Sequence, residues 1–68
     1  MGLLNIGDKV TVRTLDMYGK ENPPKKGTII EHAEIENKMQ YLVEYVDGDE
    51  DWFEERKLMG AIINRTES

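Results

Sequence analysis

The sequence predicts an all-β fold, in which five short strands form a single, strongly bent and partly open barrel with a short helical turn before the last strand. Three observations predict it. Apolar and polar residues alternate with period two in several segments, which is typical of half-buried strands. Asp47-Gly48 lies between two such segments, and Asp-Gly is a strong hairpin signal. A chain of 68 residues has too few strands for a two-sheet sandwich, so closing the sheet is the way to remove exposed edges.

The first half of the chain predicts two strands joined by a long loop. The first strand is expected within residues 7–14, where two valines alternate with polar residues. Residues 15–27 contain two glycines and an Asn-Pro-Pro run, which indicate a long loop. The second strand is expected at residues 27–33, and residues 34–38 form a polar turn. We treat residues 1–68 as one domain with a core over about 6–63.

The second half predicts a hairpin, a helical turn and a last strand. Residues 39–46 give the clearest strand pattern, and residues 49–55 return after the turn. Helical propensity at residues 55–58 is too short for more than about one turn, and residues 59–64 form the last strand. The side chains expected to be largely buried are Val10, Val12, Ile30, Val43 and Leu58.

Charge is distributed unevenly along the chain. Residues 1–34 hold equal numbers of acidic and basic side chains, so the net charge of −5 comes from residues 35–68. An acidic surface argues against binding to nucleic acid, since such binding needs Lys and Arg to neutralise phosphates. It favours a partner with a basic surface, or simple solubility. No apolar run reaches the length of a membrane span, and we expect a cytoplasmic protein without a membrane contact.

The stretch from Tyr45 to Glu55 combines six acidic residues with three aromatic ones. A two-residue turn at Asp47-Gly48 places Tyr45 and Trp52 on one face of the hairpin, and so does a four-residue loop. A three-residue turn separates them, because a slip of one residue exchanges the faces of a strand. Trp52 either forms the wall of a cation-binding pocket, where a cation–π contact contributes about 0.5–2 kcal/mol, or it fills the core.

The same stretch gives little support for a metal site or for catalysis. Asp47, Asp49 and Asp51 have the spacing that begins an EF-hand loop, but Trp52 stands where the loop needs glycine. The chain has no cysteine and one histidine, His32. Its carboxylates are expected on a solvated face, where they do not acquire the contrasting environments that acid–base catalysis needs. We therefore expect no metal, no cofactor and no enzymatic activity.

The segments "GDKVTVR", "GTII", "YLVEYVDGDEDWF", Leu58 and "AII" resemble the SH3-like small barrels over roughly residues 6–63. The order of aromatic and acidic positions is similar to that of Tudor domains, and the opening "GDKV" is similar to KOW modules. The spacing is also similar to that of a small photosystem barrel protein, PsaE-type, and of the thioredoxin-reductase variable-chain barrels. These short motifs imply a fold rather than an activity.

The Tudor resemblance implies a ligand site at the rim of the barrel. Its aromatic walls would be Tyr18, Tyr45 and Trp52, with negative charge from Asp47 and Glu50. Where Tudor cages often have another aromatic, this chain has Lys25-Lys26.

Three functional hypotheses follow from these patterns. The first is a non-enzymatic protein-interaction module that binds a basic or cationic segment at the aromatic and acidic rim. The second is a structural or accessory subunit that docks through its acidic face. The third is an acidic mimic of nucleic acid that inhibits a nucleic-acid-binding protein. The patterns do not indicate an oligomeric state.

Overall fold

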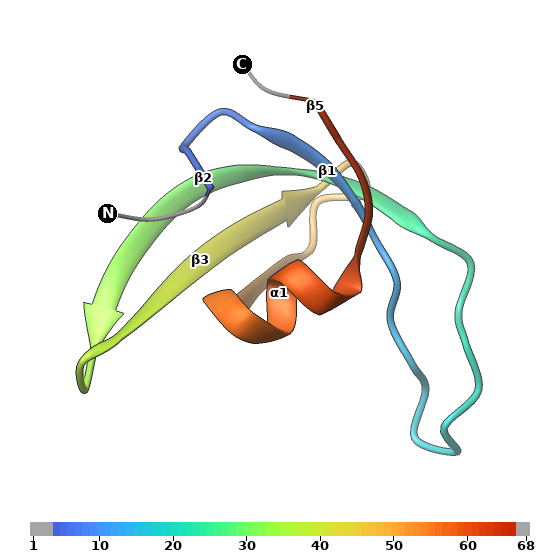
Figure 1. The fold of residues 1–68 in the computed structure, drawn as a ribbon. Coiled ribbons are helices and arrows are strands. Elements are labelled where there is room, and N and C mark those ends of the chain that lie inside the picture. Colours follow the sequence, from blue (N-terminus) through green and yellow to red (C-terminus); the bar gives the residue numbers. More distant parts are fainter. Residues whose placement is uncertain (1–3, 67–68) are drawn as a thin grey trace.

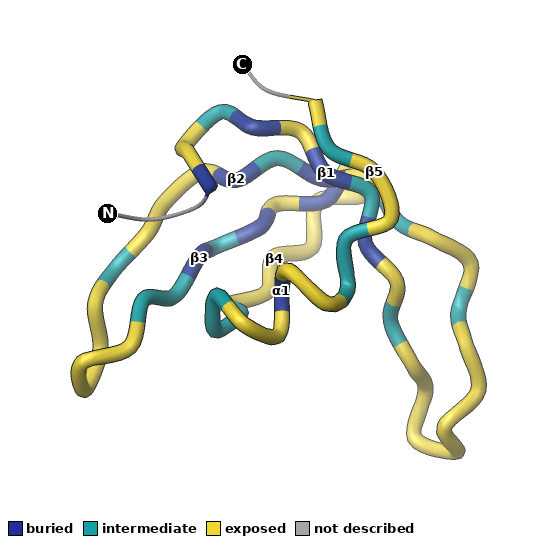
Figure 2. Tube along the Cα trace, viewed as in Figure 1, coloured by how far each residue is buried: buried dark blue, intermediate teal, exposed yellow. Residues whose placement is uncertain are grey.

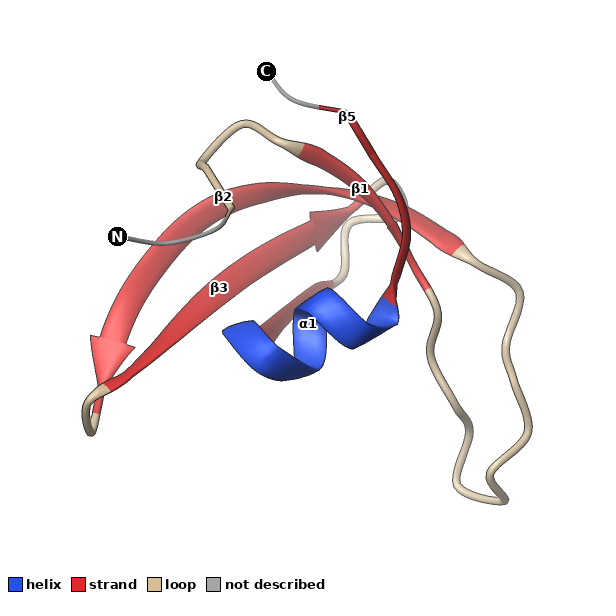
Figure 3. Cartoon of the chain, in the orientation of Figure 1, coloured by secondary structure: helices blue, strands red, loops and turns tan. Residues whose placement is uncertain are grey.

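Five antiparallel strands form one sheet in the order β4-β3-β2-β1-β5 (Figure 1). The computed structural model describes residues 4–66. Its strands are β1 (Lys9–Val12), β2 (Lys25–Ile35), β3 (Lys38–Tyr45), β4 (Glu50–Glu54) and β5 (Ile62–Thr66). One helix, α1 (Glu55–Ala61), joins β4 to β5 (Figure 3). The predicted all-β fold with a short helix before the last strand is confirmed. The bent sheet is not closed into a barrel, because β4 and β5 are its two separate edges.

The strand β2 arches over the molecule and is longer than the sequence predicted (Figure 1). It begins at Lys25, inside the expected loop, and ends at Ile35. The turn that follows consists of Glu36 and Asn37, which both have positive φ angles. Two-residue hairpin turns require such angles. Gly27 allows β2 to approach β3 closely, since a Cβ atom there would lie 2.6 Å from Val43 Cγ1.

A β-bulge in β2 reverses one prediction about the core. Ile29 pairs with Val43, and Glu31 pairs with the next residue along β3, Leu42, so Ile30 is an extra residue in the strand. Such a residue disrupts strict alternation and bends the strand. The expectation that Ile30 is buried is therefore wrong. Ile30 is 37% exposed, whereas Ile29 is fully buried.

The core lies on one face of the sheet, which we call the inner face (Figure 2). The buried apolar side chains are Leu4, Val10, Val12, Ile29, Tyr41, Val43, Tyr45 and Leu58. The predicted burial of Val10, Val12, Val43 and Leu58 is confirmed, and Tyr41, Val43 and Tyr45 share the inner face of β3 as expected. The opposite face, which we call the outer face, has no layer packed against it among residues 4–66.

The helix α1 packs against the inner face beside β3 and β4 (Figure 1). Leu58 is its one buried residue in the described structure, and the Tyr41 hydroxyl donates a hydrogen bond of 2.6 Å to Glu55 Oε2. The helix continues through Ala61, further than predicted, so β5 begins at Ile62. The Ile62 N–H donates to the Leu58 carbonyl at the end of the helix.

A buried ion pair connects the start of β1 with the last strand. Asp8 is 1% exposed, and its Oδ2 accepts hydrogen bonds from Arg65 Nη2 at 2.9 Å and Nε at 3.1 Å. The same oxygen accepts the Asn5 N–H at 3.0 Å. A buried carboxylate needs such partners because desolvation of an unpaired charge is costly.

Candidate functional site

A cation is already present at the aromatic ring that was expected to receive one. Lys25 Nζ lies 4.2 Å from the centroid of the Tyr45 ring. The same ammonium group lies 3.1 Å from Asp47 Oδ2 and 3.7 Å from Asp49 Oδ2. Lys25 begins β2, and the turn after β3 carries both aspartates, so the hairpin brings them together. The chain therefore fills this cation position with its own side chain.

The charges around Tyr45 favour this occupancy. The hydrogen bond to Asp47 raises the pKa of Lys25, against a smaller opposing effect of desolvation. The backbone N–H of Asp49 lowers the pKa of Asp47, and Lys25 lowers it further. Burial raises the pKa of Tyr45, and the Asp51 carboxylate raises it further. The buried Tyr45 hydroxyl has no hydrogen-bond partner among the described residues, so Asp51 acts on it through its charge.

Trp52 lies on the other face of the sheet from Tyr45, contrary to both registers that the sequence favoured. The turn has three residues, Val46 to Gly48, because the Tyr45 N–H donates to the Asp49 carbonyl at 2.7 Å. Gly48 has a φ of +96°, as the last residue of a common three-residue hairpin loop does. Trp52 consequently pairs with Leu42 on the outer face.

The half-exposed Trp52 does not fill the core. Its exposed fraction is 46%, whereas the residues of the core cluster are at most 3% exposed. Of the two roles considered for this side chain, core packing is excluded by its position. The structure shows an indole ring on an open sheet face, flanked along β4 by Glu50 and Glu54.

The five residues proposed as a ligand site separate into three places. Tyr18 is 82% exposed in the loop between β1 and β2, where its N–H donates to Asp16 Oδ1. Tyr45 and Asp47 meet around Lys25 on the inner side of the β3–β4 hairpin. Glu50 and Trp52 are two residues apart on the outer face of β4. A cage with all three aromatics is therefore not assembled.

Sequence reasoning missed the residues that surround Trp52. Leu42 lies directly opposite Trp52, and Glu44 lies directly opposite Glu50. Neither glutamate forms an ion pair within residues 4–66. Like charges directly opposite each other destabilise a sheet. The alternation of β3 contained this signal, since Leu42 and Glu44 occupy the face opposite to Tyr41 and Val43.

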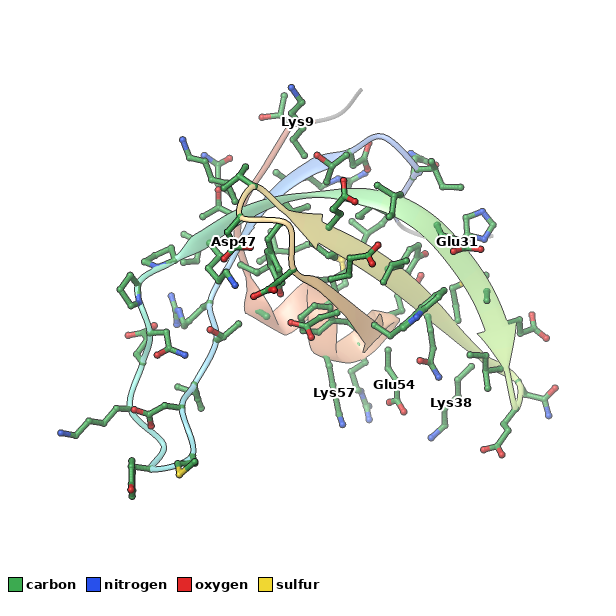
Figure 4. The ribbon with its side chains drawn as sticks, turned by 180° about the vertical axis from the view of Figure 1, so that it is seen from behind. Lys9, Glu31, Lys38, Asp47, Glu54 and Lys57 are labelled. Carbon is green, nitrogen blue, oxygen red and sulfur yellow. The ribbon has the colours of Figure 1, made fainter. Side chains whose placement is uncertain are left out.

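The outer-face acidic surface around Trp52 consists of Leu42, Glu44, Glu50, Trp52 and Glu54. One cation approaches it, because Lys38 Nζ lies 4.0 Å from Glu54 Oε1. Figure 4 shows Glu54 and Lys38 close together, with Asp47 some way off at the β3–β4 turn. This surface can offer a partner an aromatic ring, an aliphatic side chain and an uncompensated pair of carboxylates.

The described residues contain no group of three or more His, Asp or Glu side chains that could hold a metal ion. His32 is exposed, and its ring meets the edge of Tyr41 with centroids 6.4 Å apart. This is the packing contact of a residue on the sheet rather than the setting of a general base.

No protein-family model, curated protein or solved structure matches the chain. Within residues 4–66 the structure contains no helix with the length and apolar character needed to cross a membrane.

Proposed function

We propose that the chain is a non-enzymatic protein-interaction module, and that its outer-face acidic surface binds a basic segment of a partner protein. The observation that carries the proposal is the half-exposed Trp52, with Leu42 across from it and the Glu44–Glu50 pair beside it. A Lys or Arg side chain between these glutamates would relieve their repulsion. Its aliphatic stem would cover the indole, where a cation contact contributes about 0.5–2 kcal/mol.

The binding site in this proposal differs from the aromatic cage implied by the Tudor resemblance. Lys25 already provides the cation at Tyr45, so an external cation would have to displace it from two aspartates. Trp52 needs no such displacement. The partner segment would lie across the outer face of β3 and β4.

We also propose that the fold is related to the SH3-like small barrels. What supports this is the meander in which β5 returns to pair with β1, together with the long loop after β1 and the helix before β5. This assignment concerns the scaffold and carries no statement about the ligand.

The proposed function is tested by titrating the protein with a Lys- and Arg-rich decapeptide in an isothermal calorimeter. The wild-type protein should bind, and binding should weaken with added salt because exposed charges are screened over about 8–10 Å. Trp52→Ala should abolish the heat, and the double substitution Glu44→Gln/Glu50→Gln should weaken binding about tenfold, which corresponds to about 1.4 kcal/mol.

Glu36→Gln is the matched control, since Glu36 lies in the exposed β2–β3 turn, away from Trp52. It removes one charge and should leave the affinity nearly unchanged. Equal losses for Glu36→Gln and for either outer-face substitution alone would indicate unspecific attraction to an acidic protein. That result, or undiminished binding by Trp52→Ala, would contradict the proposal.

A further inference from the structure

A second region of the outer face has the opposite charge. A groove of about 430 Å³ crosses β5, β1 and β2. Its lining residues are Lys9, Val10, Thr11, Lys26, Gly27, Thr28, Val46, Asn64 and Thr66. None of them carries a carboxylate, although the chain as a whole is acidic. The six polar members all have side chains that can donate hydrogen bonds.

The strand registers place these six side chains in a compact array. Lys9 lies between Thr66 of β5 and Thr28 of β2. In the next row of the outer face, Thr11 lies between Asn64 of β5 and Lys26 of β2. The lysines are therefore diagonal neighbours across the β1–β2 pair, at a spacing of about 7–8 Å that long side chains can bridge.

The two lysines of the groove have no counter-charge in the structure. Neither Lys9 nor Lys26 forms an ion pair within residues 4–66. Lys25, the neighbour of Lys26 in the chain, points to the inner side and is paired with Asp47. Figure 4 shows Lys9 near the β5 end of the molecule, far from Glu54 and Glu31.

The β3–β4 turn forms one side of the groove. The Val46 N–H donates to the Lys26 carbonyl at 3.0 Å, which holds the turn against β2. Val46 is 84% exposed, so it adds an apolar contact next to the charged array. The groove thus combines two ammonium groups, several neutral donors and one aliphatic wall.

We propose that this groove binds a phosphorylated small molecule, with the phosphate group held between Lys9 and Lys26. A phosphate monoester carries close to two negative charges at neutral pH, which matches two ammonium groups. Its terminal oxygens accept hydrogen bonds from several directions, and Thr11 and Thr28 supply hydroxyl donors between the lysines. The volume falls within the range of small-molecule pockets, about 300–1,000 Å³, which leaves room for an organic part beside Val46.

A small ligand fits the charge of the molecule better than a polyanion does. Nucleic acid would extend beyond the groove, and the net charge of −5 would repel its phosphates. On the outer face, the row through Lys9 and Thr28 continues to Glu44 and Glu50. A chain of phosphates that followed this row would meet carboxylates one strand beyond the groove.

The test is a titration of ¹⁵N-labelled protein with inorganic phosphate and with ribose 5-phosphate, followed by amide chemical shifts. Both ligands should cause saturable shifts at Thr11, Thr28 and Asn64, whereas ribose should cause none. Ribose 5-phosphate should bind more tightly than phosphate, because its sugar contacts Val46. The substitutions Lys9→Gln and Lys26→Gln should each weaken binding about tenfold, or about 1.4 kcal/mol.

Lys20→Gln and Lys57→Gln are matched controls, because both lysines are exposed and lie outside the groove. They should leave the affinity for ribose 5-phosphate within about twofold, well under 1.4 kcal/mol. Absence of saturable shifts, or equal losses in groove and control variants, would overturn the proposal. Binding of a single-stranded oligonucleotide in the groove without binding of ribose 5-phosphate would also overturn it. None of these results depends on Trp52, so the two proposed sites are tested separately.

Discussion

Two tyrosines on the inner face of β3 have the same burial and different hydrogen bonding. Tyr41 is 1% exposed and donates its hydroxyl to Glu55 at 2.6 Å. Tyr45 is 3% exposed, and its buried hydroxyl has no hydrogen-bond partner in the described structure. A buried polar group without a partner costs about 1–3 kcal/mol, whereas a typical hydrogen bond contributes about 0.5–1.5 kcal/mol. The two side chains therefore contribute to stability with opposite signs at their hydroxyl groups.

Removing each hydroxyl in turn should reveal this difference. We expect Tyr45→Phe to leave the free energy of unfolding unchanged or to raise it by about 1 kcal/mol, because an unpaired polar group is lost. Tyr41→Phe should lower it by about 1–2 kcal/mol, because Glu55 loses its donor. Urea denaturation of both variants measures the two changes. A larger loss for Tyr45→Phe than for Tyr41→Phe would show that the Tyr45 hydroxyl has a partner in solution.

The pH dependence at the alkaline end has the same origin. Burial raises the pKa of Tyr45 above its ordinary value of 10.0, so the folded state holds this proton more tightly than the unfolded state does. The stabilising contribution is fully present below pH 10.0 and is lost as the pH rises above it. We expect Tyr45→Phe to reduce the loss of stability between neutral pH and the alkaline range. Thermal unfolding at several pH values checks this, with Tyr41 accounting for part of the loss that remains.

At the scale of elements, the bulge in β2 decides which of two adjacent isoleucines enters the core. Alternation alone assigned Ile30 to the core, since a strict period of two cannot represent an extra residue. The bulge shifts the pairing between Ile29 and Glu31 by one residue. Ile29 is fully buried against Val43, and Ile30 points toward the outer face.

This pair of side chains gives a prediction with an internal control. Ile29→Ala should lower the free energy of unfolding by about 2–4 kcal/mol, through lost burial and a residual cavity. Ile30→Ala removes the same atoms from a partly exposed position and should cost less than about 1 kcal/mol. Chemical denaturation of the two variants compares them directly. Equal effects would mean that the bulge is placed incorrectly in β2.

The sequence was sufficient for the elements that depend on local patterns. Alternation located the strands, and the four remaining core predictions hold because Val10, Val12, Val43 and Leu58 lie outside the bulge. The site could not be predicted in the same way, because it depends on turn length. Asp47-Gly48 permits both two-residue and three-residue turns, and one residue of difference moves Trp52 from one face to the other.

The internal cation at Tyr45 depends on contacts that are distant in sequence. Lys25 and Asp47 are brought together by the β2–β3 pairing, and no spacing rule connects them. The sequence did place two lysines where an aromatic was expected, which was the available sign that the chain supplies its own cation.

At the scale of the whole molecule, the ion pair between Asp8 and Arg65 joins the two ends of the described chain. β5 is an edge strand and contacts the rest of the sheet through β1 alone. The Arg65 side chain passes to the inner side and reaches a carboxylate that is almost fully buried. Removing one member of a buried pair leaves the other charge without compensation, which costs about 3–5 kcal/mol.

We therefore expect Arg65→Gln to lower the free energy of unfolding by about 3 kcal/mol. Arg56→Gln is a suitable control, because Arg56 is exposed in α1 and forms no ion pair in the described residues. It should cost less than about 0.5 kcal/mol. Hydrogen exchange should show faster exchange of the β5 amides in Arg65→Gln. Unchanged protection of β5 would mean that the strand is held by its backbone hydrogen bonds alone.

The three-residue turn between β3 and β4 restricts how the length of this chain can drift. Deleting one residue between Tyr45 and Asp49 would bring Trp52 to the inner face and turn Phe53 outward, so a single-codon deletion would act as many simultaneous core substitutions. The loop at residues 13–24 faces no such restriction, since lengthening a loop twofold costs only about 0.6 kcal/mol. Natural length variation and inserted affinity tags should therefore be tolerated near Tyr18 and Gly19. The β3–β4 hairpin should keep its length even where its acidic residues exchange freely.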